Sequence, residues 1–142
     1  MSALFPLVSA ALLAAFAGSA AATPVIRVEN AHVRPVPASL PMTAGYMSIR
    51  NLSERPDALL GATCACATEV SAHETGERGG MSTMRASATV IIPAKGAITF
   101  APGGRHLMLM GVKGGVRPGQ TVAIRLRFQR AGTITVPFTG RP

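Results

Sequence analysis

The chain has 142 residues, 48% of them hydrophobic, and its 14 Lys and Arg against 6 Asp and Glu give a formal net charge of +8. The basic residues are scattered singly, and Tyr46 is the only Tyr in a chain without Trp, so there is no stacking platform for nucleic-acid bases. We therefore exclude nucleic acid as a partner and interpret the charge as a source of solubility and of attraction to acidic proteins.

The first 22 residues have the pattern of a secretory signal peptide. The run from Leu4 to Phe16 is almost entirely apolar, and small residues at 18–22 offer a cleavage site. We predict that residues 1–22 are removed and that residues 23–142 form one domain exported to the periplasm. No later segment is long enough to span a membrane, so we expect no stable membrane insertion after signal removal. A retained N-terminal anchor is the alternative.

The rest of the chain consists of short strand-like runs separated by turns. Pairs such as Gly79-Gly80 and Pro118-Gly119 supply the positive or fixed φ that tight turns need. Ten runs qualify as strands: 25–33, 44–51, 57–62, 68–73, 82–85, 90–92, 97–100, 106–112, 121–128 and 133–138. Many short strands and no sustained helical period predict an all-β fold, an antiparallel sandwich or barrel in a single domain.

The last two runs have the clearest alternation between core and solvent. In 121–128 the side chains expected to face the core are Val122, Ile124, Leu126 and Phe128. In 133–138 they are Ile134, Val136 and Phe138. Pro137 predicts an edge position or a bulge, because proline cannot donate to a sheet ladder.

The strongest functional pattern combines two His with two Met. It has the spacing His-x10-Met-x21-His-x-Met and comprises His73, Met84, His106 and Met108. Imidazole nitrogen and thioether sulfur form a soft ligand set that suits Cu(I) better than hard cations, and neither is a thiolate that would oxidise outside the cell. A lone Met is usually core filler and a lone His is usually a surface residue, but this joint spacing is improbable by chance. The four side chains are therefore candidate ligands of one soft metal ion.

Strand parity separates these candidates from the core. In the strand expected to contain them, His106 and Met108 share the face opposite to Leu107 and Leu109. A thioether row on a non-core face has no evident packing role. The other two candidates come from an expected hairpin, in which His73 faces outward and the Met follows the turn. Acid is expected to weaken such a site, because a protonated imidazole cannot bind a metal.

The sequence resembles the PCuAC-type periplasmic copper(I) chaperones over nearly the whole mature chain. The blocks that carry the resemblance are Glu29-Asn30-Ala31, Ala44-Gly45-Tyr46-Met47, Leu59-Leu60-Gly61-Ala62, His73-Glu74-Thr75, Met84-Arg85, Ile92-Pro93-Ala94 and, most specific, the segment from Pro102 to Gly111. The resemblance implies a cupredoxin-like, antiparallel Greek-key β-sandwich that binds one Cu(I) at its rim. Carried over by position, it assigns the ligands to His73, Met84, His106 and Met108.

The resemblance also implies a function. A protein of this kind is a monomeric, non-enzymatic copper chaperone that passes Cu(I) to a copper-accepting partner. Cytochrome c oxidase subunit II, with its dinuclear copper centre, and another copper assembly factor are the partners it implies. Some relatives have a His/Met-rich C-terminal tail that can bind further copper; because this sequence reads Gly140-Arg141-Pro142 at that end, we do not expect that capacity here.

Four further residues are candidates for an auxiliary metal or redox role: Met81, Met110, Cys64 and Cys66. For each Met, a place in the core or a loop is the alternative. The two cysteines are not part of the family pattern, and on a regular strand their Cα atoms would lie near the upper limit for a disulfide. Three states stay open, namely an internal disulfide in a bent segment, free or intermolecular thiols, and a second copper–thiolate site. We interpret His32 as structural.

Other functions remain alternatives. A blue-copper electron carrier needs a Cys thiolate beside two His, and neither cysteine lies near the block from His106 to Met108. A metal-independent secreted β-sandwich could instead bind a protein or another ligand. An enzyme is the least supported reading, because the sequence offers no convincing nucleophile–base pair, phosphate loop or paired carboxylates.

Overall fold

The computed structural model describes residues 25–142, apart from the side chains of residues 77 and 78. The predicted signal peptide at 1–22 lies outside the described residues. The strands are β1 (Ile26–Val33), β2 (Met42–Asn51), β3 (Asp57–Cys64), β4 (Glu69–Arg78), β5 (Met81–Ser87), β6 (Val90–Ile92), β7 (Ala97–Phe100), β8 (Arg105–Met110), β9 (Thr121–Phe128) and β10 (Gly132–Gly140). All ten predicted runs are strands, and only the end of β4 lies more than two residues from its predicted position.

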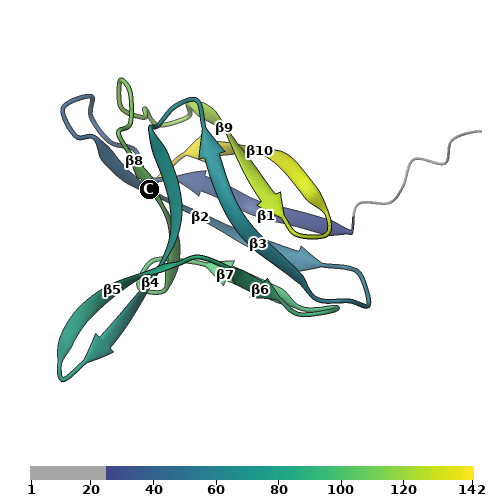
Figure 1. The fold of residues 1–142 in the computed structure, drawn as a ribbon. Coiled ribbons are helices and arrows are strands. Elements are labelled where there is room, and N and C mark those ends of the chain that lie inside the picture. The colour runs from purple at the N-terminus through teal and green to yellow at the C-terminus, as the bar shows by residue number, and fades with distance from the viewer. Residues whose placement is uncertain (1–24) are drawn as a thin grey trace, which may run out of the picture.

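Seven of these strands form a closed ring. Their order is β4-β8-β2-β1-β10-β9-β3, and the pairing of Ala62 with Val70 joins β3 back to β4. The prediction of an all-β single domain is confirmed, but the pairing of β1 with β10 is parallel instead of antiparallel. The reason is geometric: a ring with an odd number of strands cannot alternate in direction throughout, so at least one pair must be parallel. We call this ring the barrel (Figure 1).

The barrel is filled by one hydrophobic core. The predicted inward side chains of β9 are all buried, at 0–6% exposure: Val122, Ile124, Leu126 and Phe128. Leu107 and Leu109 on β8 are fully buried as well. Pro137 occupies the predicted edge position. On the side that faces β1, β10 is paired only at Thr139 and Gly140, so Pro137 has no partner strand there.

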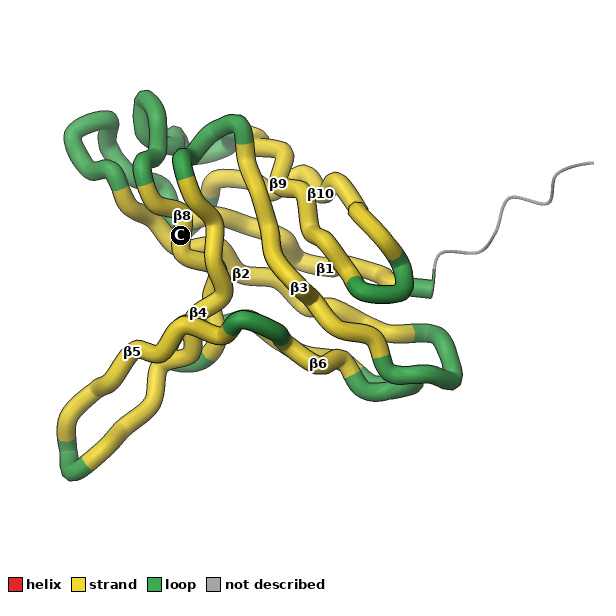
Figure 2. The backbone as a smooth tube through the Cα atoms, in the orientation of Figure 1, coloured by secondary structure: helices red, strands yellow, loops and turns green. Residues whose placement is uncertain are grey.

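The distal part of β4 and the strand β5 leave the barrel as a hairpin. Beyond Glu74, β4 no longer pairs with β8; apart from the bond from the Thr75 amide to the carbonyl of Gly104, it is bonded only to β5. Gly79 and Gly80 both have positive φ, 59° and 77°, which is the geometry that a two-residue hairpin turn of this kind requires. We call residues 75–86 the arm; Figures 1 and 2 show it projecting away from the barrel.

The described residues contain strands and loops only, as Figure 2 shows. Accordingly, residues 25–142 include no helix long and apolar enough to cross a membrane.

Candidate metal centre

The two predicted His ligands meet where β4 lies beside β8. His73 and His106 are directly opposite each other in the antiparallel register of these strands. Because opposite residues project from the same face, their rings come together, with centroids 5.8 Å apart and planes inclined by 19°. The pair lies near the start of β8, beside the turn that ends at Gly104 and close to the point where the arm leaves the barrel.

The ring of His106 is fixed by the backbone next to it. Its Nδ1 lies 3.2 Å from the carbonyl oxygen of Gly104 and, as the protonated nitrogen, donates to it. The Nε2 atom then keeps its lone pair for a metal. The side chain lies on the face opposite to Leu107, as predicted, yet only 6% of it is exposed, and the ring of His73 stacks against it.

In His73 the nitrogen available to a metal is Nδ1, whereas in His106 it is Nε2. Its Nε2 is 2.8 Å from the hydroxyl oxygen of Ser71, two residues earlier on the same face of β4. Its Nδ1 is buried and has no hydrogen-bond partner among the described residues. A buried polar atom left without a partner costs about 1–3 kcal/mol. This nitrogen is therefore suited to bind a partner that the protein itself does not supply. When Nε2–H donates to Ser71, the Nδ1 lone pair is free for a metal.

The two predicted Met ligands lie on either side of His73. Met108 is opposite Ser71 and half-buried, and Met84 is opposite Thr75 on the arm with 57% of its surface exposed. Ser71, His73 and Thr75 alternate along β4, so all four predicted ligands belong to one face of the sheet. The positions of the two Met are four residues apart along β4, about 13 Å, with the His pair between them.

The structure separates the two auxiliary Met. Met81 is 72% exposed and lies opposite Arg78, on the face of the arm that does not carry Met84. Met110 is 37% exposed and continues the row of His106 and Met108 on the outer face of β8.

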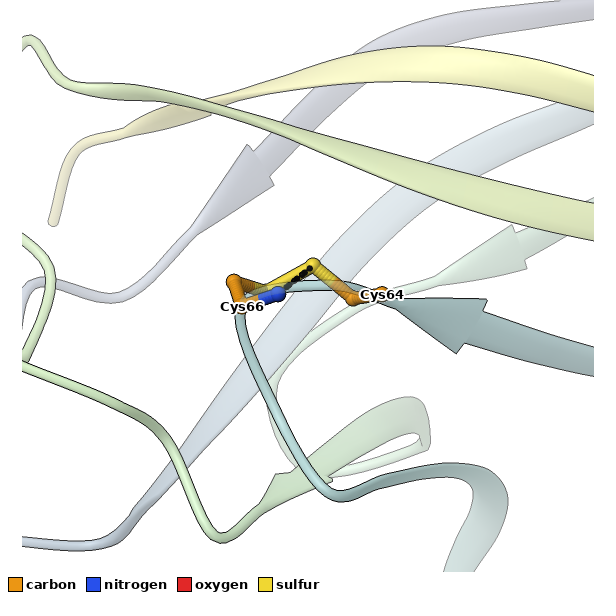
Figure 3. The surroundings of a disulfide bond; sticks show 2 residues. All are labelled: Cys64 and Cys66. Carbon is orange, nitrogen blue, oxygen red and sulfur yellow. Dashed lines mark hydrogen bonds between the residues drawn. A yellow bond between two sulfur atoms is a disulfide. The ribbon is translucent and has the colours of Figure 1, made fainter.

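The two cysteines form an intramolecular disulfide, so the first of the three open states is the one present (Figure 3). The chain leaves β3 at Cys64 and turns, which brings the two Cα atoms to 5.0 Å, well within the range for a disulfide. The amide nitrogen of Cys66 also donates to Sγ of Cys64 at 3.1 Å. In this state neither sulfur is a thiolate, and both side chains pack against the core.

Sequence reasoning missed the groups that orient the His pair. The hydroxyl of Ser71 had a detectable signal, since it stands two residues from His73 on the same face of a strand. The carbonyl of Gly104 had none, because every residue carries a backbone carbonyl.

The described residues do not include a cluster of three or more His, Cys, Asp or Glu able to hold a metal. A metal at this face would therefore need thioether ligands.

Comparisons with known proteins identify the family of the chain. A family described as "LpqE-like: Putative lipoprotein LpqE-like" matches residues 26–139. The protein named "Putative lipoprotein Lxx21020" of Leifsonia xyli subsp. xyli is 36% identical over 96 residues, which is 67% of this chain but only 58% of that relative. The chain thus spans less than two thirds of that relative's length.

Solved structures share the fold. The copper-bound PCuAC domain from PmoF2 has a TM-score of 0.71 at 24% identity, covering 82% of this chain and 92% of that domain, which bears on the fold alone. The solution structure of CuI-DR1885 from Deinococcus radiodurans has a TM-score of 0.67 at 37% identity, covering 87% of this chain and 83% of that one. Its apo form has a TM-score of 0.65 at 36% identity and covers 99% of this chain and 93% of that one.

Proposed function

The chain belongs to the LpqE-like family, and on that premise we propose that it is an exported copper chaperone that binds one Cu(I) and transfers it to a partner protein. The proposed ligands are His73, Met84, His106 and Met108. The observation that carries the proposal is the stacked His pair, in which the Nδ1 atom of His73 is buried without a partner among the described residues. The similarity to CuI-DR1885 supports copper as the metal.

The ligands differ in how firmly the fold holds them. His106 and Met108 lie on β8, which is bonded to β2 on one side and to β4 on the other. Met84 is exposed and lies on β5, which is bonded to β4 alone. Met84 is therefore the ligand that leaves first, and its place is taken by a ligand of the partner while the barrel still holds the ion.

Transfer of this kind is ligand exchange, not catalysis. The PCuAC copper chaperones are non-enzymatic, in agreement with the sequence prediction.

A family of lipoproteins indicates export, and we propose the periplasm as the compartment. For the recipient we propose cytochrome c oxidase subunit II or another copper assembly factor, on the strength of the resemblance seen in the sequence. The net charge of +8 would favour an acidic face on that partner.

The alternatives have less support. A blue-copper site needs a cysteine thiolate, and both cysteines of the sequence are joined in the disulfide. A metal-independent binding module would leave the unpartnered nitrogen of His73 without a purpose.

The direct test is an anaerobic titration with Cu(I) against a competing chelator. We expect one tightly bound equivalent, and we expect the double variant Met84→Leu/Met108→Leu to lose it, because leucine keeps the apolar volume and removes the sulfur. Met81→Leu is the matched control, since Met81 is on the arm but on its other face. Tight binding that persists in the double variant would refute the proposed ligand set.

A further inference from the structure

Three side chains form a row across the outer face of the barrel, beyond the proposed copper site. Met42 on β2 is directly opposite Met110 on β8, and Met110 is in turn directly opposite Glu69 on β4. Side chains at such positions project from the same face, with Cβ atoms about 4.5–5.5 Å apart in directly opposite pairs. The register thus brings two thioethers and one carboxylate side by side.

Neither of these Met side chains serves the core. Met42 is 47% exposed and Met110 is 37% exposed, whereas Met47, on the same strand as Met42, is 1% exposed and packs in the core. A single exposed Met needs no explanation. Two that face each other across neighbouring strands place two soft donors within reach of one ion, and thioether sulfur selects Cu(I).

The third member of the row supplies charge. Glu69 is exposed, and the two ion pairs found among the described residues, Arg27–Glu29 and Glu74–Arg105, do not include it. In a chain of net charge +8, which repels cations, a carboxylate beside the two thioethers locally favours a cation.

The row is connected to the proposed copper site by Met108. This residue lies between His106 and Met110 on the same face of β8, about 6.7 Å from each along the strand. The outer face of β8 therefore presents an unbroken series of soft donors, from the exposed pair at one end to the buried imidazole at the other.

We propose that Met42 and Met110 form a second, weaker Cu(I) site, with Glu69 beside it, through which the ion enters the main site by way of Met108. This proposal rests on the proposed function. Two uncharged thioethers bind Cu(I) more weakly than the main ligand set, as an entry site requires, and exchange of Cu(I) along the row changes no oxidation state.

The test follows the Met methyl signals by NMR in protein labelled with 13C at these methyl groups, during an anaerobic titration with Cu(I). We expect the first equivalent to shift the methyls of Met84 and Met108 and the second to shift those of Met42 and Met110. The buried Met47 serves as the internal reference. Met81 is the matched control for adventitious binding, because it is more exposed than either Met of the row but has no thioether opposite it.

The double variant Met42→Leu/Met110→Leu completes the test. We expect it to lose the second step while the first affinity stays within about twofold, a difference of less than 0.5 kcal/mol. The inference is wrong if the Met42 and Met110 methyls move no more than that of Met81 at two equivalents, or if the variant keeps the second step. Failure of the main site appears separately, as unmoved Met84 and Met108 methyls at one equivalent.

Discussion

The barrel and the arm both contribute candidate ligands but hold them in opposite ways. On the barrel, His106 is buried, is bonded to a backbone carbonyl and stacks on His73. On the arm, Met84 is exposed, and no residue of β5 is buried. A chaperone must bind an ion firmly and also release it, and this division assigns firm binding to the barrel and release to the arm.

The largest effect is expected from a barrel ligand. His106→Ala should weaken Cu(I) binding more than about 100-fold, because it removes a ligand and not merely a supporting group. Chelator competition measures the loss, and thermal unfolding of the apo protein shows that the barrel still forms. His32→Ala is the matched control, since His32 bonds to the carbonyl of Asn30, is in tilted contact with Tyr46 and lies on β1, a strand that does not pair with β8. Equal losses in the two variants would contradict the role of His106.

A smaller effect is expected from the residue that orients His73. Ser71→Ala removes the hydroxyl that lies 2.8 Å from Nε2, so the imidazole is no longer held with Nδ1 toward the metal. Loss of such an orienting group lowers metal affinity by about tenfold or somewhat more. The 15N signals of His73 provide a second measurement, because Cu(I) should shift Nδ1 in the wild type. Ser71→Thr, which keeps the hydroxyl, should restore most of the affinity; if it binds no better than Ser71→Ala, the hydroxyl is not the orienting group.

The arm should matter less than either barrel change. Ala at both Gly79 and Gly80 strains a turn with positive φ, at a cost of about 1 kcal/mol or more per residue, although an added Cβ meets no atom within 4 Å. We expect Cu(I) affinity to fall about threefold, by faster release, because affinity changes usually appear in the dissociation rate.

The thermal unfolding of the barrel should stay unchanged in this variant, since the arm buries no side chain of β5. Gly132→Ala is the matched control, because Gly132 also has a positive φ and open space around it, but lies at the start of β10, next to the turn that follows β9. Slower release from the arm variant, or an effect of Gly132→Ala on affinity, would contradict the division of roles.

The sequence predicted what depends on local patterns. Alternation and turn residues located all ten strands, and parity placed His106 and Met108 on the face away from Leu107. The contact between His73 and His106 could not be predicted in this way, because it depends on the register of two strands that are distant in the chain. The same holds for the facing of Met42 and Met110 and for the parallel pair that closes the barrel.

Of all these changes, removal of the disulfide should have the smallest effect on Cu(I) affinity. It should lower the stability of the barrel and leave the binding site intact. Cys64→Ala/Cys66→Ala opens a loop of three residues, and the chain-entropy model gives about 1.5 kcal/mol for a loop so short. Thermal unfolding should therefore occur at a lower temperature, while Cu(I) affinity remains that of the wild type. The variant is preferable to chemical reduction, because reduction would create two thiols that bind Cu(I) themselves. A change in Cu(I) affinity would mean that the segment after β3 helps to position the outer face of β4. The part of the barrel that holds Cu(I) firmly would then include more than β8 and the strands paired with it.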